Sequence, residues 1–213
     1  MKKGMLVFSV ALLLAAFMPQ PVAAGINIDL GIKGGISLAK YKSSDTGETP
    51  FNLEQPVFGV FATFNLTKSI AIQPEIYLLT QGGIMDPYDD GIDFWEYKNF
   101  YRYIHVPVLA KVRLIKKGKF MPILFAGPAV DVLLSAHNKT YKNGELNNDF
   151  DIKPFLKSTN LSLVFGGGLE FMMNKLMLVL DIRYDMGLAD ISEFAGDDTL
   201  KTRALMFMVG VGF

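Results

Sequence analysis

The strongest constraint in this sequence is an alternation of apolar and polar residues with a period of two, which recurs in eight segments. In the clearest of them, 175–186, apolar residues occupy every second position and Asp181, Arg183 and Asp185 stand between them. Such alternation is typical of β-strands, because a helix would scatter the polar residues around its circumference. The eight segments are 26–39, 57–66, 69–81, 100–114, 120–135, 160–171, 175–186 and 200–213. The sequence therefore predicts an all-β chain with an even number of strands, as bacterial barrels have.

The connections between these segments alternate between short and long. The short ones lie around 67–68, 115–119 and 172–174, and the long ones span 40–56, 82–99, 136–159 and 187–199. Outer-membrane barrels combine short periplasmic turns with longer extracellular loops. The pattern therefore favours an eight-stranded antiparallel up-and-down transmembrane β-barrel with both termini on the periplasmic side.

The first 24 residues have the pattern of a cleaved signal peptide. Lys2 and Lys3 precede an apolar stretch over 5–18, and small residues follow at 22–24. A membrane anchor is the alternative, but the apolar stretch is short for a span and Pro19 ends it. We expect export, cleavage after residue 24 and a barrel domain over 25–213. No later apolar run is long enough for a transmembrane helix, so the mature chain would have to span a membrane as a closed barrel.

Periodicity alone does not decide which face of each strand is outside. A soluble lipocalin-like barrel would enclose the apolar face, whereas a membrane barrel encloses the polar one. The loop asymmetry favours the membrane arrangement, as does a last segment with hydrophobic residues at alternate positions up to Phe213. The large apolar side chains would also overfill the narrow interior of eight strands.

The polar face carries charges of both signs, which we expect to form a structural network in the lumen. Buried charges need partners, and opposite charges inside a barrel supply them. An ion path is the alternative, but eight strands leave no wide aqueous channel, and Met206 and Met208 would narrow it further. The predicted lumen residues are Asp29, Lys33, Glu75, Lys111, Arg113, Glu170, Asp181, Arg183 and Asp185.

Composition and motifs argue against an enzyme and against nucleic-acid binding. The chain has no cysteine and a formal net charge of zero, so it lacks a basic surface for nucleic acid. Its two histidines are His105, expected in the lumen, and His137, expected at the start of a loop. No nucleophile-elbow motif is present. We predict no catalytic residues, no metal site and no cofactor.

The second long loop contains two clusters. An acidic cluster could hold calcium, although a solvated loop is the favoured interpretation because the EF-hand pattern is incomplete; it consists of Asp86, Asp89, Asp90 and Asp93. An aromatic cluster is typical of the headgroup level of a membrane. It consists of Phe94, Trp95, Tyr97, Phe100 and Tyr101.

Five short motifs resemble the PorT-like outer-membrane β-barrel family, and together they cover the mature chain. They are Gly-Ile-Lys-Gly-Gly at 31–35, Tyr-Ile-His-Val-Pro-Val-Leu at 103–109, Phe-Ala-Gly-Pro-Ala at 125–129, Asp-Ile-Arg-Tyr-Asp-Met-Gly-Leu at 181–188 and Val-Gly-Val-Gly-Phe at 209–213. The resemblance implies a barrel similar to the OmpA and OmpX types, with no catalytic residues. Some named members take part in type IX secretion and gliding. The resemblance also implies that the segment ending in Phe213 is recognised by the outer-membrane barrel-assembly machinery.

We therefore expect a non-enzymatic integral protein of the Gram-negative outer membrane with a structural, surface-interaction or secretion-associated role. Its expected partners are outer-membrane lipid, the assembly machinery and, through the long loops, a surface ligand or secretion complex. A soluble periplasmic lipocalin-like carrier of a small apolar ligand is the main alternative. A lipid-modifying barrel enzyme is a further one.

Overall fold

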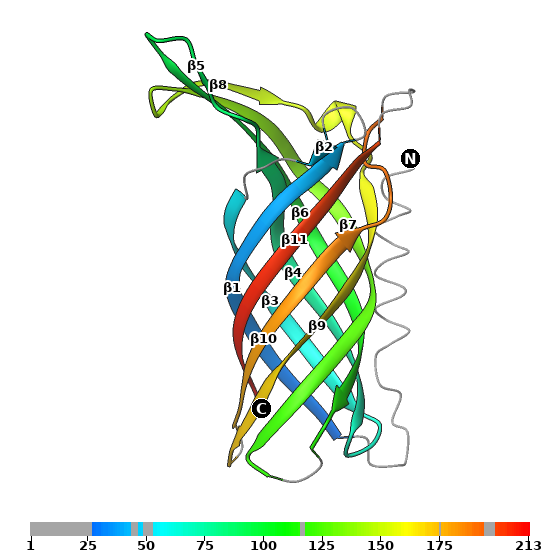
Figure 1. Ribbon diagram of the computed structural model, residues 1–213. Helices are drawn as coiled ribbons and strands as arrows, with labels where there is room; N and C mark the ends of the chain where they lie inside the picture. The colour runs from blue at the N-terminus through cyan, green and yellow to red at the C-terminus, as the bar shows by residue number, and fades with distance from the viewer. Residues whose placement is uncertain (1–26, 44–46, 49–52, 116–117, 175, 194–198) are drawn as a thin grey trace.

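The fold is a closed barrel of eight long antiparallel strands (Figure 1). The computed structural model describes residues 27–43, 47–48, 53–115, 118–174, 176–193 and 199–213. The barrel strands are β1 (Asn27–Ser43), β3 (Leu53–Asn65), β4 (Ile70–Ile84), β6 (Phe94–Arg113), β7 (Phe120–Lys142), β9 (Thr159–Met173), β10 (Leu176–Gly187) and β11 (Leu200–Gly212). Each strand pairs with the next, and β11 pairs with β1, for example at Ile36↔Phe207. The predicted fold class is confirmed.

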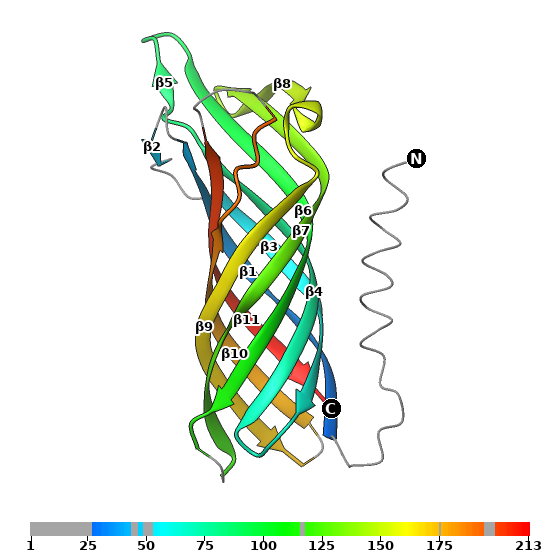
Figure 2. The same cartoon turned by 90° about the vertical axis from the view of Figure 1, so that its right-hand side faces the viewer.

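All eight predicted segments overlap a barrel strand, but the loops predicted over 82–99 and 136–159 are partly wrong. β6 begins at Phe94 and β7 continues to Lys142, so both strands extend beyond the predicted barrel wall. With β5 (Tyr88–Asp89) and β8 (Glu145–Asp151) they form a four-stranded extension at one end of the molecule (Figures 1 and 2). Polar and apolar residues are mixed on the faces of the extension, so it shows little of the apolar alternation by which a strand is recognised.

Short turns and the C-terminus lie at one end of the barrel, and the extension lies at the other (Figure 1). The turn after β3 is closed by the hydroxyl of Thr67, which accepts hydrogen bonds from the backbone N–H groups of Ser69 and Ile70. In barrels of this type the short turns are periplasmic, so the extension is extracellular. The predicted signal peptide lies outside the described residues.

Two small elements complete the extracellular end. β2 (Gly47–Glu48) pairs with the end of β1, and the 3-10 helix η1 (Lys153–Phe155) follows β8. None of the described helices is long and apolar enough to cross a membrane.

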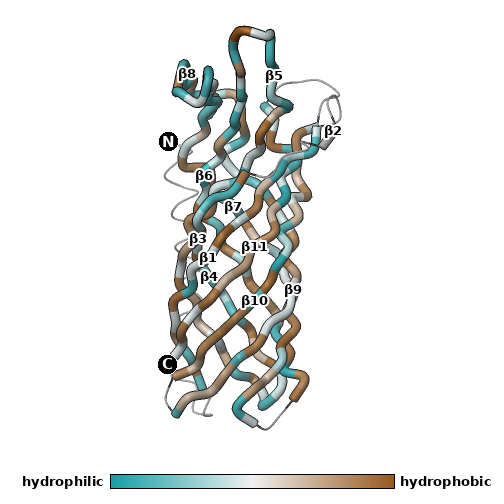
Figure 3. Tube along the Cα trace, turned by 60° about the vertical axis from the view of Figure 1, so that its left-hand side comes forward, coloured by the Kyte–Doolittle hydropathy of each residue, from teal (hydrophilic) through white to brown (hydrophobic). Residues whose placement is uncertain are grey.

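The barrel exposes its apolar residues and encloses its charges. Ile32 and Ile182 are 64% and 53% exposed on the outer wall, whereas Lys33 and Arg183, their sequence neighbours, are 4% and 1% exposed. Hydrophobic residues recur along every barrel strand in Figure 3. A soluble carrier has the reverse arrangement, with apolar side chains enclosed, so the lipocalin-like alternative is wrong.

Glycines on the inner face of β9 allow this strand to approach β10 closely. A Cβ atom added at Gly168 would lie 2.1 Å from the backbone oxygen of Leu180, and one added at Gly166 would lie 2.3 Å from that of Ile182. Both separations are far below van der Waals contact. Side chains here would force the two strands apart at the level where the interior charges meet.

Because the outer face of each barrel strand contacts lipid, a charge introduced there should destabilise the barrel. Replacing Ile182 by Arg places a guanidinium in the hydrocarbon layer, which should lower the free energy of unfolding by about 2–4 kcal/mol. Ile92→Arg is the matched control, because Ile92 is 87% exposed on the extracellular hairpin; it should change stability by less than about 0.5 kcal/mol. Urea unfolding of the barrel in lipid vesicles measures both. Equal effects of the two variants would contradict the assignment of the outer face to lipid.

Candidate functional site

The middle of the lumen is crossed by a neutral cluster of four charged side chains, the middle layer. Arg183 on β10 is 2.5 Å from a carboxylate oxygen of Glu75 on β4, a strand on the opposite wall. Arg183 also lies 2.8 Å from Asp181. Lys33 Nζ is 3.2 Å from Glu75 and 2.7 Å from Asp181. The four residues bring two positive and two negative charges together.

Aromatic rings support the two cations of the middle layer. The guanidinium carbon of Arg183 lies 5.4 Å from the ring centre of Tyr77 and 5.1 Å from that of Phe125. Lys33 Nζ lies 4.8 Å from the ring centre of Phe61. Cation–π contacts of this kind strengthen when the cation is desolvated.

A second cluster, the lower layer, lies toward the turn end of the barrel. Glu170 accepts hydrogen bonds of 2.6 Å from both Lys111 and Arg113. Arg113 also donates to the side-chain oxygen of Asn65, at 2.7 Å, and Asn65 donates to Asp29 at 2.8 Å. Asp29 is only half-buried and joins the network through the amide of Asn65. The other charged residues of this layer, Lys111, Arg113 and Glu170, are buried.

Gln73 joins the two layers and was not identified from the sequence as a network residue. Its amide nitrogen donates to Glu75 at 2.5 Å, while its amide oxygen accepts from Thr63 at 2.8 Å and from Lys111. Gln73 stands on the same alternating face of β4 as Glu75, which is the signal that identifies it. The lumen charges therefore form one continuous network over two layers.

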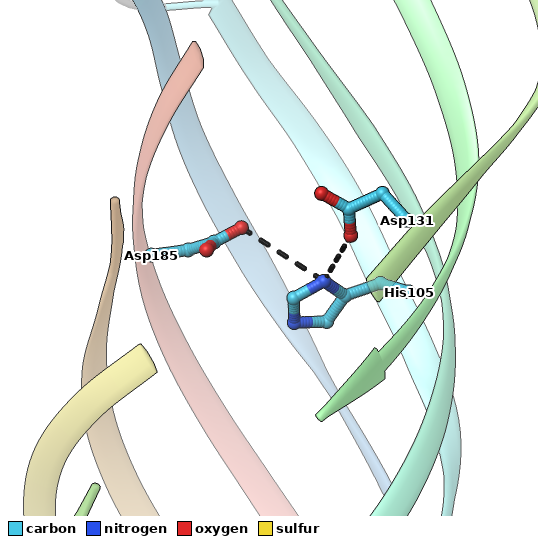
Figure 4. Close-up of side chains that lie close together, drawn as sticks. All are labelled: His105, Asp131 and Asp185. Carbon is cyan, nitrogen blue, oxygen red and sulfur yellow. Dashed lines mark hydrogen bonds and ion pairs between the residues drawn. The ribbon is translucent and has the colours of Figure 1, made fainter. Parts of the chain in front are cut away.

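A third cluster, the upper layer, lies toward the extracellular end and is built around His105 (Figure 4). His105 Nδ1 is 2.5 Å from Asp131 on β7 and 3.9 Å from Asp185 on β10. Gln81 donates to Asp185 at 2.8 Å, and Asn160 donates to Asp131 at 2.9 Å. All five side chains are buried. Only Asp185 belonged to the predicted charge network, and His105 was expected in the lumen.

An apolar group closes the lumen above the upper layer. Tyr101, Tyr103 and Leu133 pack there with Leu156 and Ile191, and each is at most 8% exposed. The prediction that Tyr101 belongs to an aromatic girdle at the headgroup level is therefore wrong. The cause is the strand parity of β6, which turns Tyr101 inward along with Tyr103.

Other parts of the lumen are closed by apolar residues as well. Met206 and Met208 are 1% and 4% exposed and pack with Val57, Tyr77 and Leu79, so their predicted inward position is confirmed. Together with the charge layers, these buried side chains occupy the interior at several levels.

The extracellular extension carries aromatic rings paired with lysines. Lys98 Nζ lies 4.9 Å from the ring centre of Tyr141, and Lys142 Nζ lies 5.3 Å from that of Trp95. Its margins expose apolar side chains to the solvent. The exposed apolar residues are Tyr88, Ile92, Leu146 and Phe150.

In the turn between β5 and β6, acidic side chains accept hydrogen bonds and form an ion pair within the extension. The backbone N–H groups of Asp93 and Ile92 donate to Asp90, and they hold the pKa of its carboxyl below the usual range. Asp93 pairs with Lys142 at 2.7 Å. The hydrogen bond and charge of Lys142, with the amide of Asn143, lower the pKa of Asp93. These contacts agree with the solvated loop that the sequence favoured over a calcium site.

Comparison with known proteins identifies the class of this barrel. Residues 19–193 match the family model described as outer membrane protein beta-barrel domain. Comparison with curated proteins finds no match. Neisserial surface protein A has a similar structure, with a TM-score of 0.50 and 13% identity over 89% of this chain and 100% of that chain. OprG from Pseudomonas aeruginosa gives a TM-score of 0.46 and 11% identity over 89% and 96%. The protease OmpT from Escherichia coli gives 0.48 and 11% over 88% and 96%.

The middle layer predicts a large cost for removing one partner. Replacing Arg183 by Met leaves Glu75 without its opposite-wall partner, and should destabilise the barrel by about 3–5 kcal/mol. The double variant Arg183→Met with Glu75→Gln should lose less, because Lys33 then balances Asp181. Urea unfolding followed by circular dichroism measures the free energies. A double variant less stable than the single one would contradict the pairing.

Proposed function

Because the chain belongs to the outer membrane protein beta-barrel family, and the protein therefore lies in the bacterial outer membrane, we propose that it is a non-enzymatic barrel that contacts a partner through its extracellular extension. One observation carries this proposal. β6 and β7 continue past the barrel and, with β5 and β8, build a sheet that the barrel itself does not need for closure.

The edges of the extension are suited to contact with another chain. Among the described residues, β8 pairs only with β7 and β5 pairs only with β6, so each presents one unpaired strand edge. Unpaired edges bind extended segments of partner proteins by adding a strand. The exposed apolar side chains of Phe150 and Leu146 on β8 would give such contact its side-chain specificity.

The interior supports a structural role for the barrel wall and not a transport role. Arg183 and Glu75 join opposite walls, and Gln81 and Asp185 do so again at the upper layer. An ion moving through the lumen would have to break these buried contacts. This favours the structural network that the sequence predicted over an ion path.

The partner we propose is a surface or secretion-associated protein, as in the PorT-like family that the sequence resembles. The resemblance motifs 103–109 and 181–188 fall on β6 and at the end of β10, where they supply His105, Asp181 and Asp185. The first of these motifs thus lies on a strand that continues into the extension, and the partner itself would contact the extension.

We further propose that the assembly machinery recognises the C-terminal segment through Phe213. Phe213 is 68% exposed on the outside of the barrel, and its backbone N–H donates to the carbonyl of Leu30 at 2.8 Å. The ring therefore contributes little to packing in the folded barrel, which leaves it available for a role during insertion.

Site-specific photo-crosslinking on living cells tests the surface contact. A benzophenone amino acid at Phe150 or Ile92 should give discrete protein adducts, because both positions project from the extension. The same group at Val209, on the lipid-facing wall, is the control and should give none. Adducts at Val209 alone, or the absence of adducts at both extension positions, would contradict the proposal.

Replacing Phe213 by Ala should slow insertion without loss of stability. Pulse-chase labelling with heat-modifiable gel migration follows the folded barrel, and urea unfolding of the folded fraction reports stability. Val211→Ala is the matched control, since Val211 faces outward two positions earlier and should assemble at the normal rate. Normal assembly of the Phe213 variant would refute recognition through this ring.

A further inference from the structure

The upper layer differs from the two layers below it in charge balance. The middle layer pairs Lys33 and Arg183 with two carboxylates. In the lower layer Lys111 and Arg113 both pair with the single carboxylate of Glu170, and Asp29 joins only through Asn65. The upper layer holds two carboxylates and one imidazole, which can supply at most one positive charge. Within the described lumen, this is therefore the layer with an excess of negative charge.

That excess is fully desolvated. His105, Asp131 and Asp185 are each 0% exposed. An unbalanced carboxylate in such surroundings is costly and demands either a proton or a cation. Asp131 takes a hydrogen bond from His105 Nδ1, while Asp185 lies 3.9 Å from the same nitrogen and lacks that close contact.

The donor atoms of the cluster come from three strands, β6, β7 and β10. His105 and Asp131 are directly opposite each other on β6 and β7, and Asp131 is directly opposite Asn160 on β9. Asp185 enters from β10, as Figure 4 shows. One imidazole nitrogen and one oxygen from each carboxylate all lie within 4.8 Å of one another.

Some polar atoms of the residues around this cluster are unsatisfied. Gln81 and Asn160 direct their amide groups to the cluster, since their nitrogens donate to Asp185 and Asp131. Their amide oxygens are buried and have no hydrogen-bond partner among the described residues, and the same holds for His105 Nε2. Buried polar atoms are ordinarily satisfied, so unsatisfied ones on three neighbouring residues leave hydrogen-bonding capacity beside the cluster unused.

We propose that His105, Asp131 and Asp185 bind a divalent first-row transition-metal ion. A set of one imidazole and two carboxylates suits such an ion, with Zn²⁺ as the probe. Its two positive charges would cancel the two carboxylates with neutral His105. Two ligand atoms of a tetrahedral zinc site lie about 3.4 Å apart. His105 Nδ1 must therefore move away from the carboxylate oxygen of Asp131 by roughly 1 Å. This proposal replaces the sequence-based expectation that the chain has no metal site.

The apolar group above the cluster determines how the ion enters. Tyr101, Tyr103 and Leu133 cover the upper layer on its extracellular side. An ion therefore enters most readily while the strands close, because metal binding and folding are then coupled. The test accordingly supplies the metal during refolding.

The experiment measures zinc retained by the full-length barrel after refolding in detergent with Zn²⁺ and dialysis against metal-free buffer. Wild type should retain one zinc per chain by elemental mass spectrometry. His105→Ala and Asp185→Asn should each lower retained zinc by roughly tenfold or more, since even outer contacts of a metal site are worth about that much. His137→Ala is the matched control: His137 pairs with Asp149 on the surface, and its loss should leave zinc unchanged.

A second measurement separates metal binding from misfolding of a variant. Zinc should raise the urea midpoint of wild type, because a ligand of the folded state stabilises it, and should leave that of Asp185→Asn unchanged. Heat-modifiable migration selects the folded fraction. Wild type without retained zinc and without a zinc-dependent midpoint would overturn the proposal and leave a hydrogen-bonded histidine–aspartate pair. Loss of zinc in His137→Ala would overturn it too, by placing the metal on the surface.

Discussion

Hydrogen bonding of the backbone inside a hydrocarbon layer is the requirement on which the rest of this structure depends. Lipid offers no partners to peptide groups, so every strand must have a neighbour on both sides. The pairing of β11 with β1 provides this by closing the ring. Closure then divides each strand into an outer and an inner face. The two-residue alternation of the sequence places apolar side chains against lipid and polar ones inside.

Enclosing the polar face creates the second requirement, that of charge balance. Removing charges from water is costly, and the barrel meets the cost by joining cations and anions from opposite walls. These contacts also specify register, because shifting any strand by one residue would turn its charges toward lipid. Buried ion pairs often add little net stability, but here an incorrect pairing of strands is penalised on both faces. The charged interior therefore favours the native strand register over alternative pairings of the strands.

The sequence predicts those parts of the structure in which the two faces differ. The strand of Asp181 and Arg183 was identified because lipid lies on one side of it and charge on the other. The extension was missed because water lies on both of its faces, so β8 mixes polar residues with Leu146 and Phe150 without a period of two. Tyr101 was misplaced because aromatic residues suit the headgroup level and the interior alike. Asp131 and Gln81 were not identified as members of the upper layer, because only the pairing of the strands shows which polar residues lie close together.

The upper layer and the extension are parts of the same two strands. β6 carries His105 and β7 carries Asp131, and both strands run on into the extracellular sheet, with a shift in their pairing register between Arg102 and Tyr103. Long paired strands transmit displacement along their length, since their backbone hydrogen bonds leave little freedom to bend independently. His105 and Asp131 contact Asp185 of β10 just below this shift, at the base of the two strands that build the extension. The buried polar centre and the extension thus share β6 and β7, and Asp185 brings the opposite side of the barrel into contact with the base of both strands.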